Sequence, residues 1–93
     1  MVSIETAREW LRIDGTDNDV IIQGLLDAVP SYIEIATGLI PTAQADEPLA
    51  DTVTKFLLTL WYNAEQAEAE RLQRTIDGLL KALTVKAREI AEV

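Results

Sequence analysis

The segment TKFLLTLWYN, residues 54–63, carries the pattern that decides how this chain folds. At helical spacing its apolar side chains cover two faces of one helix. One face holds Phe56, Leu57 and Leu60, and the other holds Leu58, Trp61 and Tyr62. A helix that is apolar nearly all round is usually buried on every side, but a chain of 93 residues has a limited core. The sequence therefore raises the question of what covers the second face.

The composition is that of one folded domain over residues 1–93. Hydrophobic residues make up 48% of the chain and charged residues 26%, which is typical of a globular protein and unlike a disordered one. The chain has no cysteine and no histidine. It therefore lacks thiol chemistry as well as the commonest general base and the commonest metal ligand. We expect neither an enzyme nor a bound cofactor or metal.

The net charge of −8 argues against specific nucleic-acid binding. DNA-binding proteins cluster basic side chains on a phosphate-facing surface, whereas here Arg71 and Arg74 stand among glutamates and the other basic residues are dispersed. No stretch approaches the roughly 20 apolar residues of a membrane span. The charged residues near the N-terminus are also unlike a signal peptide. The sequence therefore predicts a soluble protein with no membrane partner.

Apolar residues recur at three- and four-residue steps through most of the chain, which predicts an all-α fold. We expect a small helical bundle with a short N-terminal helix, two main helices and a C-terminal helix. Its core is expected to span about residues 3–67, with a C-terminal arm or helix over about residues 76–92.

Local signals predict where the first two helices begin and end. Ser3 is expected to be the N-cap of the first helix. Thr16 is expected to be the N-cap of the second, with Asp19 three residues later completing a capping box. Gly38 stands where a left-handed C-terminal cap is expected. Pro30 falls inside the second helix, and because it has no N–H it is expected to kink or split the helix there.

The second half of the chain is expected to contain a loop and a further helix break. Residues 39–48, LIPTAQADEP, have prolines near both ends and predict a loop, after which Pro48 suits the first turn of a helix. A helix unbroken from there to the C-terminus would be unusually long for this domain. We therefore expect a break at TIDG, residues 75–78.

Beyond that break, an apolar stripe is a candidate contact surface. Leu79, Leu83 and Ile90 lie along it at helical spacing. Exposed on a monomer, such a stripe would be an apolar patch that needs a partner. It is expected either to fold back on its own domain or to dock on another protein.

Several short motifs occur in a characteristic order. They are Leu11-Arg12-Ile13, the acidic turn 14–19, Tyr32-Ile33-Glu34, Thr37-Gly38 and the closing Trp61-Tyr62. Together they resemble the phage head–tail connector family, small helical adaptor proteins of tailed phages that are also described as head-completion or DNA-packaging proteins. The resemblance covers about residues 3–65.

The resemblance implies a structural virion assembly protein. Such proteins form a homo-oligomeric ring beneath the portal, extend the DNA channel and provide a platform for the next head-completion or tail protein. It implies a location at the head–tail junction of the virion, with assembly in the host cytoplasm. DNA would only pass through the channel, which carboxylates could line.

Two alternatives remain open at this point. The second face of segment 54–63, with Leu58, Trp61 and Tyr62, is expected either to pack on a neighbouring subunit or to complete the monomer core. The chain could also be a small acidic helical binding module that regulates a basic partner. A regulator is expected to remain a monomer or dimer, whereas a connector assembles into a ring.

Overall fold

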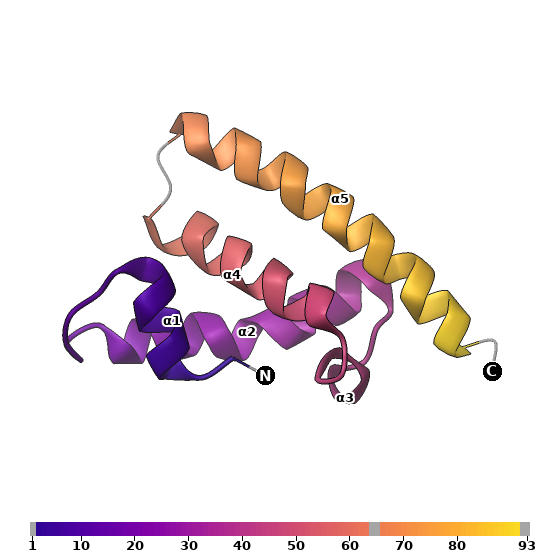
Figure 1. Cartoon of the computed structure of the whole chain (residues 1–93), viewed down its shortest axis with the longest axis horizontal. Helices are drawn as coiled ribbons and strands as arrows, with labels where there is room; N and C mark the ends of the chain where they lie inside the picture. Colours follow the sequence, from indigo (N-terminus) through magenta and orange to yellow (C-terminus); the bar gives the residue numbers. More distant parts are fainter. Residues whose placement is uncertain (1, 64–65, 92–93) are drawn as a thin grey trace.

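The computed structural model describes residues 2–63 and 66–91, and over these ranges the fold is all-α, as the sequence predicts (Figure 1). The helices are α1 (Ile4–Leu11), α2 (Asp19–Thr37), α3 (Pro41–Gln44), α4 (Pro48–Asn63) and α5 (Gln66–Ala91). Residues 64–65 of the expected core and residue 92 of the expected C-terminal helix lie outside the described residues.

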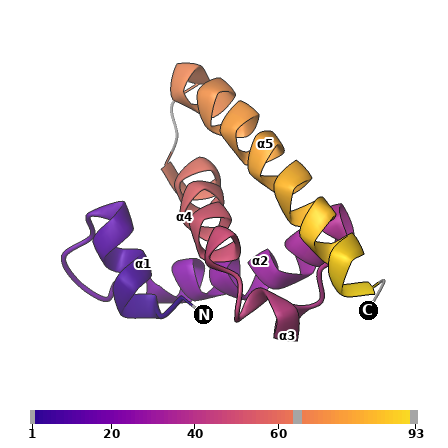
Figure 2. The ribbon, with the colours of Figure 1, turned by 45° about the vertical axis from the view of Figure 1, so that its right-hand side comes forward.

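Helix α4, which contains the segment that is apolar nearly all round, is the central element of the bundle. It packs against α1, α2, α3 and α5. Figures 1 and 2 show α1 on one side of α4, α5 running back along the other side, and α2 crossing beneath. Other helices of the same chain therefore cover both apolar faces of α4, which explains how so short a chain can contain such a helix.

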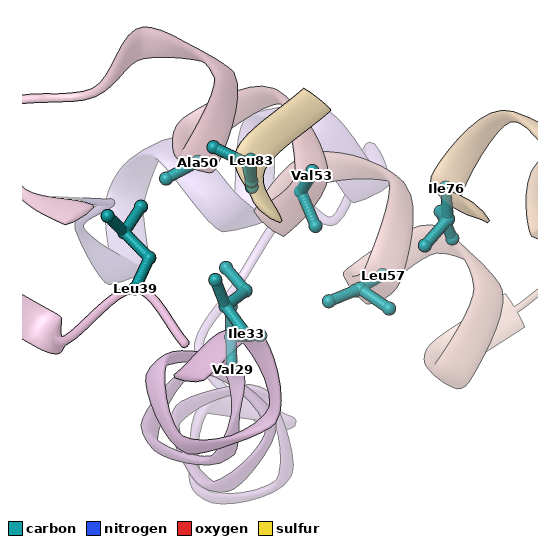
Figure 3. Close-up of a cluster of buried hydrophobic side chains, with 8 residues drawn as sticks. All are labelled: Val29, Ile33, Leu39, Ala50, Val53, Leu57, Ile76 and Leu83. Carbon is teal, nitrogen blue, oxygen red and sulfur yellow. The ribbon is translucent and has the colours of Figure 1, made fainter. Parts of the chain in front are cut away.

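The first buried cluster joins α2, α4 and α5 (Figure 3). Its members are Val29, Ile33, Leu39, Ala50, Val53, Leu57, Ile76 and Leu83. Ile33 comes from α2, Leu57 from α4 and Leu83 from α5, so the cluster depends on all three helices. Burial of this apolar surface is the main force that holds α5 to the rest of the chain.

The second buried cluster covers the other face of α4. It consists of Ala7 from α1, Ile22 and Leu26 from α2, and Leu58 from α4. Partly buried apolar side chains, Tyr62 among them, surround it. Helix α1 is thus the element that closes the second face of segment 54–63.

The ends of α1 are fixed by local hydrogen bonds. Ser3 is its N-cap, because the Thr6 N–H donates to the Ser3 hydroxyl oxygen at 3.2 Å. Arg12 follows the helix in the left-handed conformation with φ of 57°, and its N–H donates to the Glu9 carbonyl at 3.1 Å. This cap turns the chain sharply, so that the next segment can lead into α2.

We expect Ser3→Ala to lower the free energy of unfolding by about 1 kcal/mol, because the Thr6 N–H would lose its acceptor at the helix start. Urea denaturation followed by circular dichroism measures the loss. Ser3→Asp is the matched control, since aspartate also caps helices and is expected to retain most of the stability. Equal losses in the two variants would contradict the capping role.

Helix α2 begins two residues later than the Thr16 signal predicted, because its N-cap is Asn18. Its first residue is Asp19, and its N-cap Asn18 makes no side-chain capping bond. The Asp19 carboxylate instead meets the Arg8 guanidinium, with Nε and Oδ1 3.0 Å apart. Because this ion pair joins α1 to α2, Asp19 serves the packing of two helices rather than a capping box with Thr16, and the predicted N-cap was wrong.

Pro30 does not split α2, which continues from Asp19 to Thr37. The carbonyl of Pro30 accepts a hydrogen bond from the Gln44 side-chain amide at 3.0 Å, and the same amide donates to the Leu39 carbonyl at 2.8 Å. Gln44 belongs to α3, a short helix inside the segment expected to be a loop. Pro41 starts α3 at a position where its missing N–H costs nothing.

Gly38 ends α2 as the sequence predicts. Its φ is 85°, in the left-handed region, and its N–H donates to the Glu34 carbonyl at 2.7 Å. The glycine also lies beside α5, because a Cβ built on Gly38 would be 4.0 Å from that of Ala87. The end of α2 therefore lies against α5 near Ala87.

The expected break at residues 75–78 was wrong, because α5 is a single helix from Gln66 to Ala91. Ile76 lies at the middle of this range and is fully buried in the first cluster. Its burial outweighs the cost of the glycine two residues on, which is about 1 kcal/mol relative to alanine. The Gln73 side-chain amide also donates a hydrogen bond to the Asp77 carboxylate, one turn further along the helix, at 2.9 Å. The boundary between the last two helices lies earlier than expected, since α4 ends at Asn63 and α5 begins at Gln66.

Helix α2 also corrects the expectation that no segment is long and apolar enough to span a membrane. An 18-residue window of this 19-residue helix has a mean hydropathy of 1.2, which meets that criterion by length and composition alone. Core helices of soluble proteins meet the same criterion, and α2 contributes Ile22 and Ile33 to the two buried clusters. The absence of a membrane partner remains a prediction.

Candidate assembly surfaces

Two of the side chains predicted to lie at a subunit interface are inside the monomer. Leu58 is 0% exposed and belongs to the second cluster, where α1 and α2 cover it. Leu83 is also fully buried, against α2 and α4 in the first cluster. Neither side chain has surface to offer a neighbour in this fold. The interface prediction was therefore wrong for both, because the monomer itself supplies their partners.

The two aromatic residues that close the α4 segment have different surroundings. The Trp61 ring packs edge-on against the Tyr32 ring of α2, with centroids 5.5 Å apart and planes at 85°. It keeps 36% of its surface exposed, whereas Tyr62 is partly buried against the second cluster. Both side chains contribute to monomer packing, and each keeps part of its surface accessible to a partner.

The predicted stripe along α5 runs from the core out to the helix end. Leu83 is buried, Leu79 packs partly buried against the first cluster, and Ile90 is 54% exposed. Figures 1 and 2 show the last turns of α5 extending beyond the end of α2 and the short α3. The stripe therefore seals the monomer for most of its length and leaves its last apolar residue accessible.

The exposed side of α2 carries a second set of small and apolar residues that the sequence analysis missed. We call it the outer α2 face, and its residues are Val20, Gly24, Ala28, Ser31 and Ile35. All five are exposed, and both Val20 and Ile35 have 87% of their surface accessible. Their three- and four-residue spacing was the available signal. The periodic signal is weak because the three residues between Val20 and Ile35 on this face are glycine, alanine and serine, which add little hydrophobicity.

One end of the outer α2 face is hollowed. An open depression of about 480 Å³ lies between the start of α1 and the first half of α2. It is lined by Ile4, Asp19, Val20, Gln23, Gly24 and Asp27. We call it the α2 hollow. The Asp19 carboxylate is paired with Arg8, and Asp27 accepts a hydrogen bond from the Gln23 amide through one of its two oxygens. The hollow therefore suits an apolar side chain that has a basic neighbour close to Asp27.

A smaller hollow of about 160 Å³ lies where α2, α3 and α4 meet near Pro30. The Gln44 amide there is already bonded to two backbone carbonyls, and the Thr54 hydroxyl donates to the Ala50 carbonyl at 2.8 Å. These polar groups serve the monomer. In the described ranges no group of three or more acidic side chains is placed to hold a metal ion.

Charge is distributed unevenly between the two surfaces. The charged residues of α2 are Asp19, Asp27 and Glu34, and the helix has no lysine or arginine. The end of α5 is basic, with Lys81, Lys86 and Arg88 against the single acid Glu89 over residues 81–91. In a protein of net charge −8, this basic end complements the acidic side chains of α2 that flank the outer α2 face.

Comparison with known proteins identifies one family. No curated protein and no solved structure shows significant similarity to the chain. The phage gp6-like head-tail connector proteins match it over residues 1–92, which includes all five helices. The match agrees with the order of motifs from Leu11-Arg12-Ile13 to Trp61-Tyr62. The chain therefore belongs to the phage gp6-like head-tail connector protein family.

Proposed function

We propose that this protein forms a closed ring beneath the portal of a tailed phage, where it extends the DNA channel and joins the head to the tail. The observation that carries the proposal is the family match over residues 1–92. Membership of this family implies a structural virion component that assembles with other head and tail proteins. The portal and the next head-completion or tail protein are the proposed partners, and host cytoplasm is the proposed place of assembly.

The surfaces of the monomer support assembly into a ring. A ring needs heterologous contacts, in which one patch meets a different patch on the next copy. The outer α2 face and the overhanging end of α5 are two such different patches, and each leaves large apolar side chains in water. Burial of these side chains between copies would lower the free energy of the assembled state.

The acidic charge suits a channel through which DNA passes. Each copy carries a net charge of −8, so a ring would bring many negative charges around one axis. A carboxylate-lined channel repels the phosphate backbone, which allows DNA to slide without binding. In this proposal DNA passes through the channel and is not bound as a specific ligand.

Solution mass separates the connector from a small acidic regulator. We expect size-exclusion chromatography with light scattering, at physiological ionic strength and over a range of protein concentrations, to reveal a closed species of many subunits. The same measurement with purified portal added is expected to show the two proteins migrating together. A protein that stays a monomer or dimer under both conditions would contradict the ring and favour the regulator.

A further inference from the structure

We infer that the α2 hollow receives the end of α5 from a second copy of this chain, with Ile90 entering the hollow and Lys86 lying beside Asp27. The inference rests on the proposed ring, because it names the pair of surfaces that joins neighbouring subunits. It is carried by an unexplained glycine, two exposed apolar side chains and complementary charge.

Gly24 has no function within the monomer that explains a glycine there. It lies inside α2, where glycine costs about 1 kcal/mol relative to alanine. Its φ is not positive, and a Cβ built on it meets no atom within 4 Å. Glycine is suited to a position where another chain must approach the backbone closely. In the monomer nothing approaches Gly24, so a close approach there requires a bound partner.

Gly78 in α5 shows what distinguishes Gly24. A Cβ on Gly78 would also meet nothing within 4 Å. However, the residues three and four positions from it are Arg74, Thr75, Lys81 and Ala82, all exposed and two of them charged, which marks a solvated surface. The residues at the same distances from Gly24 are Val20, Ile21, Asp27 and Ala28, of which one is charged, and two of them, Val20 and Asp27, line the hollow. Only Gly24 therefore lies in an apolar depression.

The end of α5 has the shape and charge that the hollow requires. Lys86 and Ile90 are four residues apart, so they lie on the same side of the helix. Ile90 can bury its exposed surface against Ile4 and Val20, while the Lys86 ammonium lies near the Asp27 carboxylate. This contact between unlike charges offsets part of the repulsion between copies that each carry −8.

The two surfaces lie where a head-to-tail contact needs them. In Figure 1 the start of α2 is at the left and the end of α5 at the right, toward opposite ends of the longest dimension of 44 Å. A copy that uses its α5 end on one neighbour keeps its α2 hollow free for another. Such contacts continue from copy to copy and close when the rotation between copies permits.

The test blocks each surface separately, under the condition in which the wild-type protein assembles. Gly24→Gln fills the hollow with a helix-compatible side chain. Ile90→Asp removes the apolar residue and brings a negative charge to a hollow that Asp19 and Asp27 line. We expect each variant alone to lose about tenfold or more in association constant and to be monomeric by light scattering. Gly78→Gln, the same change on the solvated face of α5, is expected to assemble like the wild-type protein. Circular dichroism checks that all three variants are folded.

Mixing the two blocked variants gives the decisive result. The Gly24→Gln copy keeps an intact α5 end and the Ile90→Asp copy keeps an intact hollow, so an equimolar mixture is expected to form one dimer and nothing larger. A mixture that stays monomeric, or that forms rings, would overturn the pairing. Assembly of Gly24→Gln at wild-type strength would overturn it and leave the ring intact. A wild-type protein that never assembles, with or without the portal, would overturn the proposed function as well.

Discussion

Leu58→Asp is expected to abolish the folded monomer. The side chain is 0% exposed among Ala7, Ile22 and Leu26, with no basic group in the second cluster to pair with a new carboxylate. An unpaired buried charge costs several kcal/mol or forces the group to become neutral. That cost is comparable with the whole stability of a small domain, about 5–15 kcal/mol. Circular dichroism during urea denaturation is expected to show little or no cooperative transition.

Ile35→Asp is the matched control for this variant. It introduces the same aspartate at an apolar position of α2, but Ile35 is exposed in the monomer, so the carboxylate stays hydrated. We expect its unfolding midpoint to remain close to that of the wild-type protein. If Leu58→Asp unfolded at the same urea concentration as Ile35→Asp, Leu58 would be accessible to solvent, and its earlier interpretation as an interface residue would return.

Leu83→Ala is expected to lower the free energy of unfolding by about 2–5 kcal/mol. The leucine is fully buried in the first cluster, where it connects α5 to Ala50 and Val53 of α4 (Figure 3). Truncation removes apolar contacts and leaves a cavity, because α2 and α4 can close around it only in part. Urea denaturation gives the free energy, provided that the slope of the transition is unchanged.

Val85→Ala provides the comparison on the same helix. Val85 is exposed, so its truncation is expected to change stability by no more than about 0.5 kcal/mol. A loss for Leu83→Ala as small as that for Val85→Ala would mean that α5 is an arm loosely attached to the bundle. A much larger loss of stability for Leu83→Ala than for Val85→Ala, as expected here, would show that α5 is part of the monomer core.

The sequence predicts the parts of this fold that depend on local chemistry. The helical periodicity, the Ser3 cap and the Gly38 cap each depend on a few adjacent residues, and the structure has all three. Thr16 was a misleading cap signal because Asp19, which would have completed it, pairs with Arg8 on another helix. A side chain with two possible partners cannot be assigned from its neighbours in sequence alone.

Tertiary packing also explains why α5 has no break at residues 75–78. Residues 75–78 combine a β-branched pair with a glycine and predict a break, yet burial of Ile76 keeps α5 continuous. Helix α4 ends at Asn63, where the sequence has no glycine or proline to mark a boundary.

The candidate site was predicted only in part, for a related physical reason. An apolar pattern indicates that a face will be covered, but it does not specify whether the cover comes from the same chain or from another copy. Helix α1 covers Leu58, whereas the stripe on α5 extends past the core and leaves Ile90 exposed. The outer α2 face was missed because its central residues are too small to register as an apolar stripe.

Electron microscopy of the protein mixed with purified portal is the most direct test of the ring. End views are expected to show a closed ring with a central opening, and side views to show this ring seated coaxially on one end of the portal. Single copies scattered on the portal without contact between them, or no binding to the portal at all, would rule out the ring at the portal.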